Sequence, residues 1–184
     1  MPFLTFYTPT YKRPRLLADC HTSIQMQSDS DWEHVVIPDL VGIGIAGVFR
    51  EVKNNVGKIT GRYVYFLQDD DVIADEDMVR DIKKFAIANN YPPVIIARNI
   101  KGALNLPLNW HSEPLKGTID LGSYIVRADV FTLHANQFGE RYEGDFDFIH
   151  FLWDAGYDFA WFDRLIARAQ QWGYGMPEQE AEPV

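Results

Sequence analysis

The sequence predicts an α/β fold, a three-layer sandwich in which a mostly parallel central sheet carries helices on both faces. Short apolar runs alternate with amphipathic stretches through the first half of the chain, a pattern typical of a parallel sheet covered by helices. The chain has 184 residues, which suits one domain with one proper core. Hydrophobic residues make up 47% of it and aromatic residues 14%, as in a globular protein.

The elements are expected in the following order. Short apolar runs, bounded by proline, glycine or aspartate, predict strands at residues 3–7, 34–37, 63–67 and 94–97. Helical spacing between them predicts helices at residues 15–26, 46–59 and 75–88. Residues 99–116 are polar with two prolines and are expected to form a long loop, which in compact domains is often functional. A strand at 119–127, a helix at 144–155 and a strand at 157–162 complete the prediction.

Charge and composition exclude several classes of protein. The net charge of −9 argues against a general nucleic-acid binder, which would need a basic face. Cys20 is the only cysteine, so no intrachain disulfide can form, and a cytoplasmic location is expected. No apolar run approaches about 18 residues, so we expect no membrane span. A single domain is expected over residues 1–175, followed by a flexible acidic tail at 176–184.

The stretch YVYFLQDDD leads an apolar strand directly into Asp69, Asp70 and Asp71. Adjacent like charges repel, so water or a cation must make the cluster tolerable. Carboxylate oxygens suit Mg²⁺ or Mn²⁺, and such an ion could be shared with a diphosphate. The alternative is a solvated turn with an aspartate capping the next helix. Ligands of such sheets bind at the carboxyl ends of strands, where residues 8–13 and Asp39 are also expected.

Several segments, in order, resemble the GT-A-fold, family 2 inverting glycosyltransferases. FLQDDD looks like the family's Asp-x-Asp-type metal motif, and LTFYTPTYKRPRLLADC is similar to its opening strand, Pro-Thr-Tyr-Asn-Arg turn and first helix. NNVGKITGRYVYFLQDDD and GDFDFIHFLWDAGYDFAWF resemble two further family segments. The resemblance covers roughly residues 3–165. It implies a GT-A (Rossmann-like) fold and a metal-assisted, inverting transfer from a nucleotide-sugar donor, such as a UDP-sugar, to a hydroxyl of a glycan or another acceptor.

The resemblance also implies a nucleotide pocket. It would be formed by Thr8, Pro9, Thr10, Tyr11 and Arg13. Asp39 would accept a hydrogen bond from the base, and Asp69 would lie near the ribose. The alternative for residues 8–13 is a strand-ending turn followed by a solvated basic start to a helix.

The resemblance assigns the chemistry to carboxylates. Asp70, with Asp71 as a weaker candidate, would bind Mn²⁺ or Mg²⁺. Asp145 would be the general base, and burial could raise its pKa toward the working range; its alternative role is a helix N-cap. The candidate acceptor contacts are Trp110, His111, Gly122 and Ser123, although Trp110 and His111 also fit a packed loop anchor. His21, His34, His134 and His150 show no metal-ligand spacing.

Departures from the family pattern keep other functions open. Gln68 stands where the family often has Asp, Gly144 where it often has Glu, and ARAQQWGYG replaces a basic or His-containing segment. A non-catalytic nucleotide- or sugar-binding module is therefore one alternative.

A second alternative is an NAD-binding oxidoreductase. Gly42, Gly44 and Gly47 match G-x-G-x-x-G, and Asp69 follows about twenty residues later. Pro38 and Asp39 interrupt the strand that this fingerprint requires.

Overall fold

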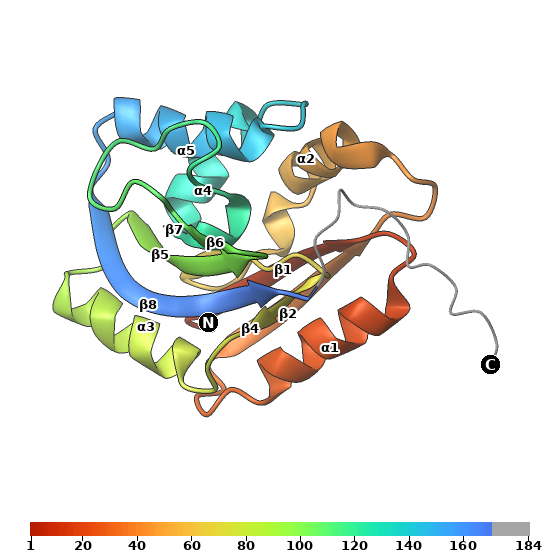
Figure 1. Cartoon of the computed structure of the whole chain (residues 1–184), viewed down its shortest axis with the longest axis horizontal. Helices are drawn as coiled ribbons and strands as arrows, with labels where there is room; N and C mark the ends of the chain where they lie inside the picture. The colour runs from red at the N-terminus through yellow and green to blue at the C-terminus, as the bar shows by residue number, and fades with distance from the viewer. Residues whose placement is uncertain (171–184) are drawn as a thin grey trace.

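An eight-stranded sheet with helices on both faces forms the molecule (Figure 1). The structure, a computed structural model, describes residues 1–170 except for the side chain of Ile45. The strands are β1 (Leu4–Thr10), β2 (Trp32–Pro38), β3 (Tyr63–Phe66), β4 (Asp71–Ile73), β5 (Val94–Lys101), β6 (Leu104–Leu106), β7 (Tyr124–Arg127) and β8 (Phe159–Ala169). Their order is β2-β1-β3-β7-β5-β8-β4, with β6 paired to β5. Strands β1, β2, β3, β5 and β8 run in one direction, and β4, β6 and β7 run against them.

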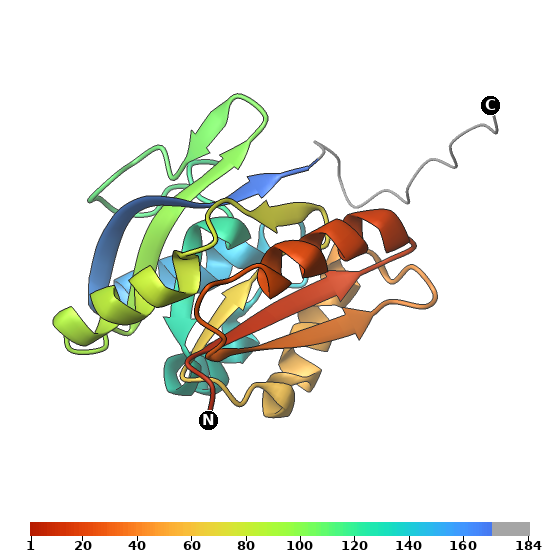
Figure 2. The same cartoon turned by 90° about the horizontal axis from the view of Figure 1, so that it is seen from below.

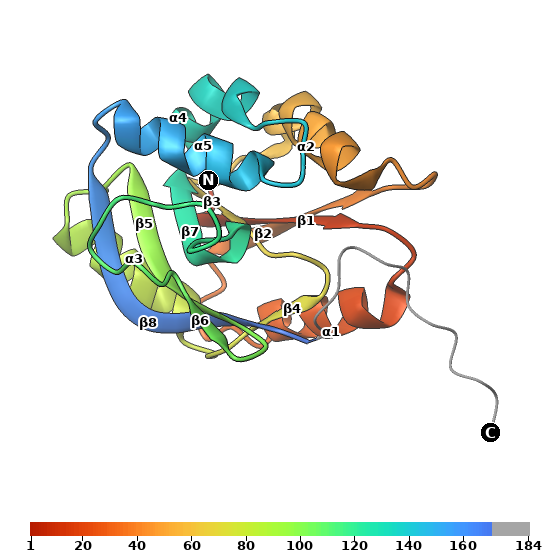
Figure 3. The same ribbon diagram turned by 45° about the horizontal axis from the view of Figure 1, so that its top comes forward.

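Two helical layers cover the sheet and confirm the predicted three-layer α/β class. Helices α1 (Pro14–Gln25) and α3 (Met78–Ala88) lie on one face, seen in front of the sheet in Figure 2. Helices α2 (Gly44–Asn54), α4 (Ala128–His134) and α5 (Gly144–Asp154) lie on the other face, nearest the viewer in Figure 3. Alternation along β1 supplies both cores, because Phe6 packs in the α1/α3 cluster and Tyr7 in the α2/α4/α5 cluster.

The structure differs from the predicted elements at several places. β5 continues past residue 97 and turns back into β6, so a hairpin occupies the start of the expected 99–116 loop. β4 and α4 were not predicted, and β8 extends well beyond residue 162. The predicted tail at residues 176–184 lies outside the described residues. Within residues 1–170, no helix combines the length and the apolar character needed to cross a bilayer.

The topology defines one functional edge, which we call the carboxyl-end rim. Here β1, β2, β3 and β5 end, and the turns that follow them meet. β7 runs against β3, so the residues that precede it, a 3-10 turn labelled η2 (Leu121–Ser123), also lie at this rim. Helix α5 begins there too, because a hydrogen bond joins Asp145 to Leu121.

Candidate functional site

A buried arginine joins the first two aspartates of the acidic cluster. Arg13 follows the turn after β1, and its Nη1 lies 2.8 Å from Asp69 Oδ1 and 3.0 Å from Asp70 Oδ2. All three side chains are almost fully buried. Burial raises the pKa of Asp69 and outweighs the opposing contacts with Thr10 and Arg13. A protein cation therefore neutralises part of the charge that the sequence places after β3.

Asp71 has no such partner. Its side chain is fully buried, and among residues 1–170 neither of its carboxylate oxygens has a hydrogen-bond partner, nor has Asp69 Oδ2. Burial raises the pKa of Asp71 to about 7, Lys101 opposes the rise, and Asp70 and Asp120 add to it. Buried polar atoms without partners cost free energy. Carboxylate oxygens are ligands that a divalent cation can bind, so the chemistry of the Asp71 side chain fits such an ion.

A shallow, mostly apolar hollow lies where β1 and β2 end. It is lined by Tyr7, Pro9, Ile37, Pro38, Asp39, Ile43, Val48 and Glu51. Two residues of the predicted nucleotide pocket, Pro9 and Asp39, are therefore brought together here.

The Asp39 carboxylate is held by the turn that follows β2. It accepts hydrogen bonds from the backbone N–H groups of Val41 (3.0 Å), Gly42 (2.7 Å) and Ile43 (2.7 Å). Burial raises its pKa, but these three bonds together lower it below the ordinary value.

The other residues of the predicted pocket take different positions. Thr8 is fully buried, and its Oγ1 lies 2.9 Å from His34 Nε2, inside the β1–β2 layer. Thr10 hydrogen-bonds to Asp69. The Tyr11 ring packs on Gly42, where an added Cβ would lie 2.7 Å from the Tyr11 Oη. Thr8 and Thr10 therefore belong to strand β1 rather than to the expected turn, and the Thr8 hydroxyl points toward the interior.

The glycine motif does not have the geometry of a dinucleotide site. The amides of Val41, Gly42 and Ile43, which would have to receive a diphosphate, already bind the Asp39 carboxylate. The motif also follows β2, at the edge of the sheet, and β1 separates that strand from β3, which Asp69 follows. A dinucleotide fingerprint places its acidic residue on the neighbouring strand.

Asp145 occupies the first turn of α5. Its Oδ2 accepts a hydrogen bond from the backbone N–H of Leu121 (3.1 Å), and its Oδ1 from that of Phe146 (2.9 Å). The N-cap position belongs to Glu143, so Asp145 is not the cap of this helix. Burial, assisted by the negative charge of Asp120, raises the pKa of Asp145 to about 6. A carboxylate with this pKa can exchange a proton near neutral pH.

A buried polar network beside Asp145 was missed from the sequence. Lys101 Nζ lies 3.0 Å from Asp120 Oδ2 and donates to Gln68 Oε1 at 2.9 Å. Asn99 Nδ2 donates to both Asp120 oxygens, at 2.9 and 3.2 Å, and Ser123 Oγ donates to Oδ1. The run IDLGS, with an aspartate before Gly-Ser, was the available hint for Asp120; the expected loop at 99–116 hid Asn99 and Lys101.

Two glycines allow close packing around the site. A Cβ on Gly144 would lie 2.0 Å from the carbonyl oxygen of Gly139 and 2.7 Å from Phe49 Cδ2, so the glutamate common in the resembled family does not fit here. A Cβ on Gly122 would lie 2.4 Å from Asn99 Nδ2 and 3.6 Å from Asp71 Oδ2. Gly122 therefore connects the polar network with the acidic cluster.

The predicted acceptor contacts separate into two places. Gly122 and Ser123 are buried in η2 at the carboxyl-end rim. Trp110 packs against Trp161 of β8, with a ring-centroid distance of 5.2 Å, and the Arg98 guanidinium lies 4.1 Å from its centroid. His111 lies 5.1 Å from the same Trp161. Trp110 thus has the contacts of a loop anchor.

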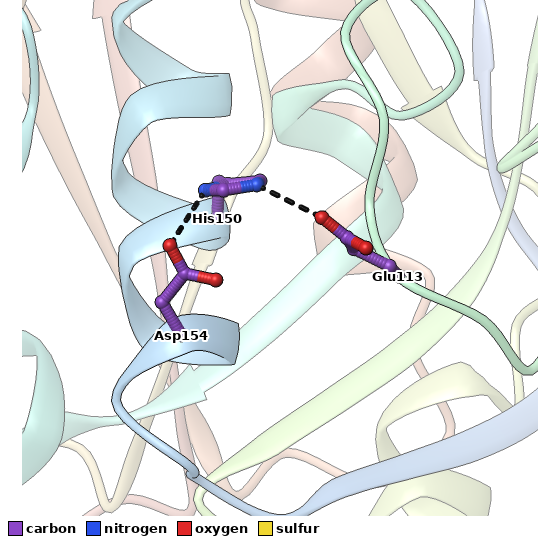
Figure 4. Close-up of side chains that lie close together, drawn as sticks. All are labelled: Glu113, His150 and Asp154. Atoms are coloured by element: carbon purple, nitrogen blue, oxygen red, sulfur yellow. Dashed lines mark hydrogen bonds and ion pairs between the residues drawn. The ribbon is translucent and has the colours of Figure 1, made fainter.

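A second group with metal-ligand chemistry joins α5 to the loop that follows β6 (Figure 4). His150 Nε2 lies 3.2 Å from Glu113 Oε1, and His150 Nδ1 lies 3.3 Å from Asp154 Oδ2. The imidazole stands between the two carboxylates, so its ring nitrogens point in opposite directions. His150 thus links the loop to the helix, and one ligand atom from each of the three residues lies within 4.8 Å of the others, so the group could hold a metal ion.

Comparisons with solved structures agree with the fold. No protein-family model and no curated protein matches the chain. The structure of S. aureus TarS 1-349 is similar with a TM-score of 0.67 and 15% identity, over 92% of this chain and 60% of that chain. Its complex with UDP-GlcNAc is similar with a TM-score of 0.64 and 16% identity, over 99% and 60%. A CMP:2-keto-3-deoxy-manno-octonic acid synthetase complexed with CTP gives 0.52 and 11%, over 89% and 90%.

These similarities establish the architecture. They confirm the predicted GT-A, Rossmann-like fold class. The chain spans about 60% of the TarS chain that it matches.

Proposed function

We propose that this chain is a glycosyltransferase domain that moves a sugar from a nucleotide-sugar donor, with UDP as the nucleotide, to an acceptor hydroxyl with inversion. The observation that carries the proposal is the meeting of Asp145 and the acidic cluster at one rim, joined through η2. TarS, similar in fold, has been crystallised with UDP and with UDP-GlcNAc, which supports this class of donor.

In this proposal the donor nucleotide lies across the ends of β1 and β2. The apolar hollow beside Pro9 and Asp39 receives the base, and its walls exclude water from the ring. Asp39 reaches the base only when one of its backbone hydrogen bonds opens or is shared. Arg13 orients Asp69 toward the ribose.

Asp70 and Asp71 are the residues that would hold a divalent ion. When bound, such an ion stabilises negative charge on the departing diphosphate. The buried Asp71 oxygens would be ligands for the ion. The ion pair with Arg13 holds the Asp70 side chain in place beside them.

Asp145 acts on the acceptor. Its carboxylate takes the hydroxyl proton as the acceptor oxygen bonds to the anomeric carbon, and the bond from that carbon to the phosphate oxygen breaks, which releases the nucleoside diphosphate. The hydrogen bonds from Leu121 and Phe146 fix the carboxylate, so little orientation is lost on reaching the transition state.

The test is turnover by Asp145→Asn with a panel of UDP-sugars. Release of UDP, with water or added sugars as acceptor, should fall by about 10²-fold or more in the variant, while UDP binding by calorimetry stays within twofold. In the wild type, kcat/KM should rise with pH through about 6, where Asp145 loses its proton. Wild-type turnover in the variant would refute the base assignment. Nucleotide binding without turnover in the wild-type protein would favour the non-catalytic module.

A further inference from the structure

Lys101 and Asp120 lie beside the proposed base but are too enclosed to be simple surface charges. The side chain of Lys101 is 19% exposed and that of Asp120 is 16% exposed. Lys101 ends β5, and Asp120 precedes η2, so two elements far apart in the sequence bring the charges together. An enclosed ion pair contributes little net stability after its desolvation cost. Its place in the site therefore calls for another explanation.

Asp120 is held from three directions. Lys101 binds Oδ2, Asn99 donates to both oxygens, and Ser123 donates to Oδ1 from within η2. These contacts fix both the carboxylate and the backbone that follows it. The next backbone N–H, that of Leu121, donates to Asp145 Oδ2 at 3.1 Å. The Leu121 amide, which orients the proposed base, thus belongs to the residue directly after Asp120, whose carboxylate is fixed by these contacts.

The two charges act on Asp145 with opposite sign. The negative charge of Asp120 makes ionisation of Asp145 harder and raises its pKa, whereas the positive charge of Lys101 lowers it. Tyr124 packs from β7, and its hydroxyl donates to the Asp145 backbone carbonyl; its own pKa is raised, by burial first, so it stays neutral. Asp120 and Lys101 therefore act on the Asp145 carboxylate with opposite sign from the same side-chain network.

We propose that Lys101 and Asp120 form a positioning pair that orients Asp145 through the Leu121 amide and sets the pH range in which it can act as a base. This inference rests on the proposed function for its catalytic meaning, because it concerns the base of that reaction. Neither residue touches the reacting atoms.

The test is a set of variants that change the charge of Lys101 or Asp120, and the measured quantity is the pH midpoint at which Asp145 titrates. Asp120→Asn should lower the Asp145 titration midpoint by roughly one pH unit, and Lys101→Met should raise it by a similar amount. Lys101→Arg keeps the charge and should leave the midpoint within a few tenths of wild type. The double variant Lys101→Met/Asp120→Asn removes both charges, avoids an unpaired buried carboxylate and should return the midpoint toward wild type.

The readout is the carboxyl ¹³C shift in aspartate-labelled, chelator-treated full-length protein, with the Asp145 signal identified by its loss in Asp145→Asn. Asp163→Asn, which removes an exposed carboxylate paired with Arg98, is the matched control and should move nothing. Shifts in the same direction for both single variants, or no shift in either, would overturn the proposal.

The titration separates this inference from the proposed function. If the midpoints move in opposite directions and kcat/KM moves with them, the positioning role is supported. If transfer occurs but the acidic side of the pH profile of kcat/KM is the same in both variants as in the wild type, the pair has no such role and the glycosyltransferase proposal stands. If the midpoints move but no donor is turned over, the proposed function fails, and with it the catalytic meaning of the pair.

Discussion

Arg13 determines how the acidic cluster can exist in the folded protein. The sequence shows three adjacent aspartates and predicts that water or a cation makes the cluster tolerable, but it cannot show which. The structure supplies a guanidinium from the β1–α1 turn to Asp69 and Asp70 and leaves the oxygens of Asp71 without partners among residues 1–170. Arg13 is thus the cation for one end of the motif, and a divalent ion at Asp71 is the proposed cation for the other.

Replacing Arg13 by methionine should destabilise the protein strongly. The change leaves two carboxylates buried without their shared cation, a loss of about 3–5 kcal/mol in the free energy of unfolding. The deficit should be largest at neutral pH and should shrink as the pH falls, because burial raises the pKa of Asp69 and its protonation removes uncompensated charge. Urea unfolding of both proteins at several pH values measures this.

Arg50→Met provides the control for that prediction. Arg50 pairs with Glu140 at 4.0 Å on the surface, so its removal should barely move the unfolding midpoint. An equal loss in both variants, or a deficit for Arg13→Met that does not change with pH, would contradict the role assigned to the buried arginine.

At the scale of elements, short apolar runs predict the strands that form the centre of the sheet. β1, β3 and the first half of β5 are buried on both faces and appear in the sequence as continuous apolar runs. For the second half of β5 the sequence instead predicts a loop, because Asn99 and Lys101 interrupt the apolar run. Both side chains are polar because they contact Asp120, which is distant in the sequence. The local pattern of apolar residues cannot predict such a contact.

The η2 turn should be sensitive to a single methyl group. Gly122→Ala places a Cβ 2.4 Å from Asn99 Nδ2, so the Asn99–Asp120 contact must shift. We expect a loss of about 1–3 kcal/mol in stability, and a reduced rate of UDP release as the Leu121 amide moves. Thermal unfolding and the turnover assay measure the two effects.

Gly57→Ala is the matched control, since nothing lies within 4 Å of its added Cβ. It should be neutral or slightly stabilising, because alanine has fewer conformations in the unfolded chain. If Gly122→Ala behaves like Gly57→Ala, the close packing of η2 does not matter for the site.

At the scale of the whole molecule, topology explains why so much of the site was predictable. Parallel strands end at one edge, so Thr10, Asp39 and Asp69 were expected to meet before any contact was known. Asp120 was not expected, because β7 runs against its neighbours and brings the start of a strand, rather than its end, to the same rim. Lys101 was not expected, because the sequence predicts a loop where β5 continues. The side-chain direction of Thr8 was equally hidden, since it depends on His34 from the next strand.

The central claim is that the carboxyl-end rim binds a nucleoside diphosphate with the help of a divalent ion. The most direct measurement is isothermal titration of the full chain with UDP, with and without Mn²⁺, beside NAD⁺. We expect UDP to bind and Mn²⁺ to tighten that binding tenfold or more, about 1.4 kcal/mol, and we expect no binding of NAD⁺. Binding of NAD⁺ without metal, or no binding of UDP in either condition, would contradict it.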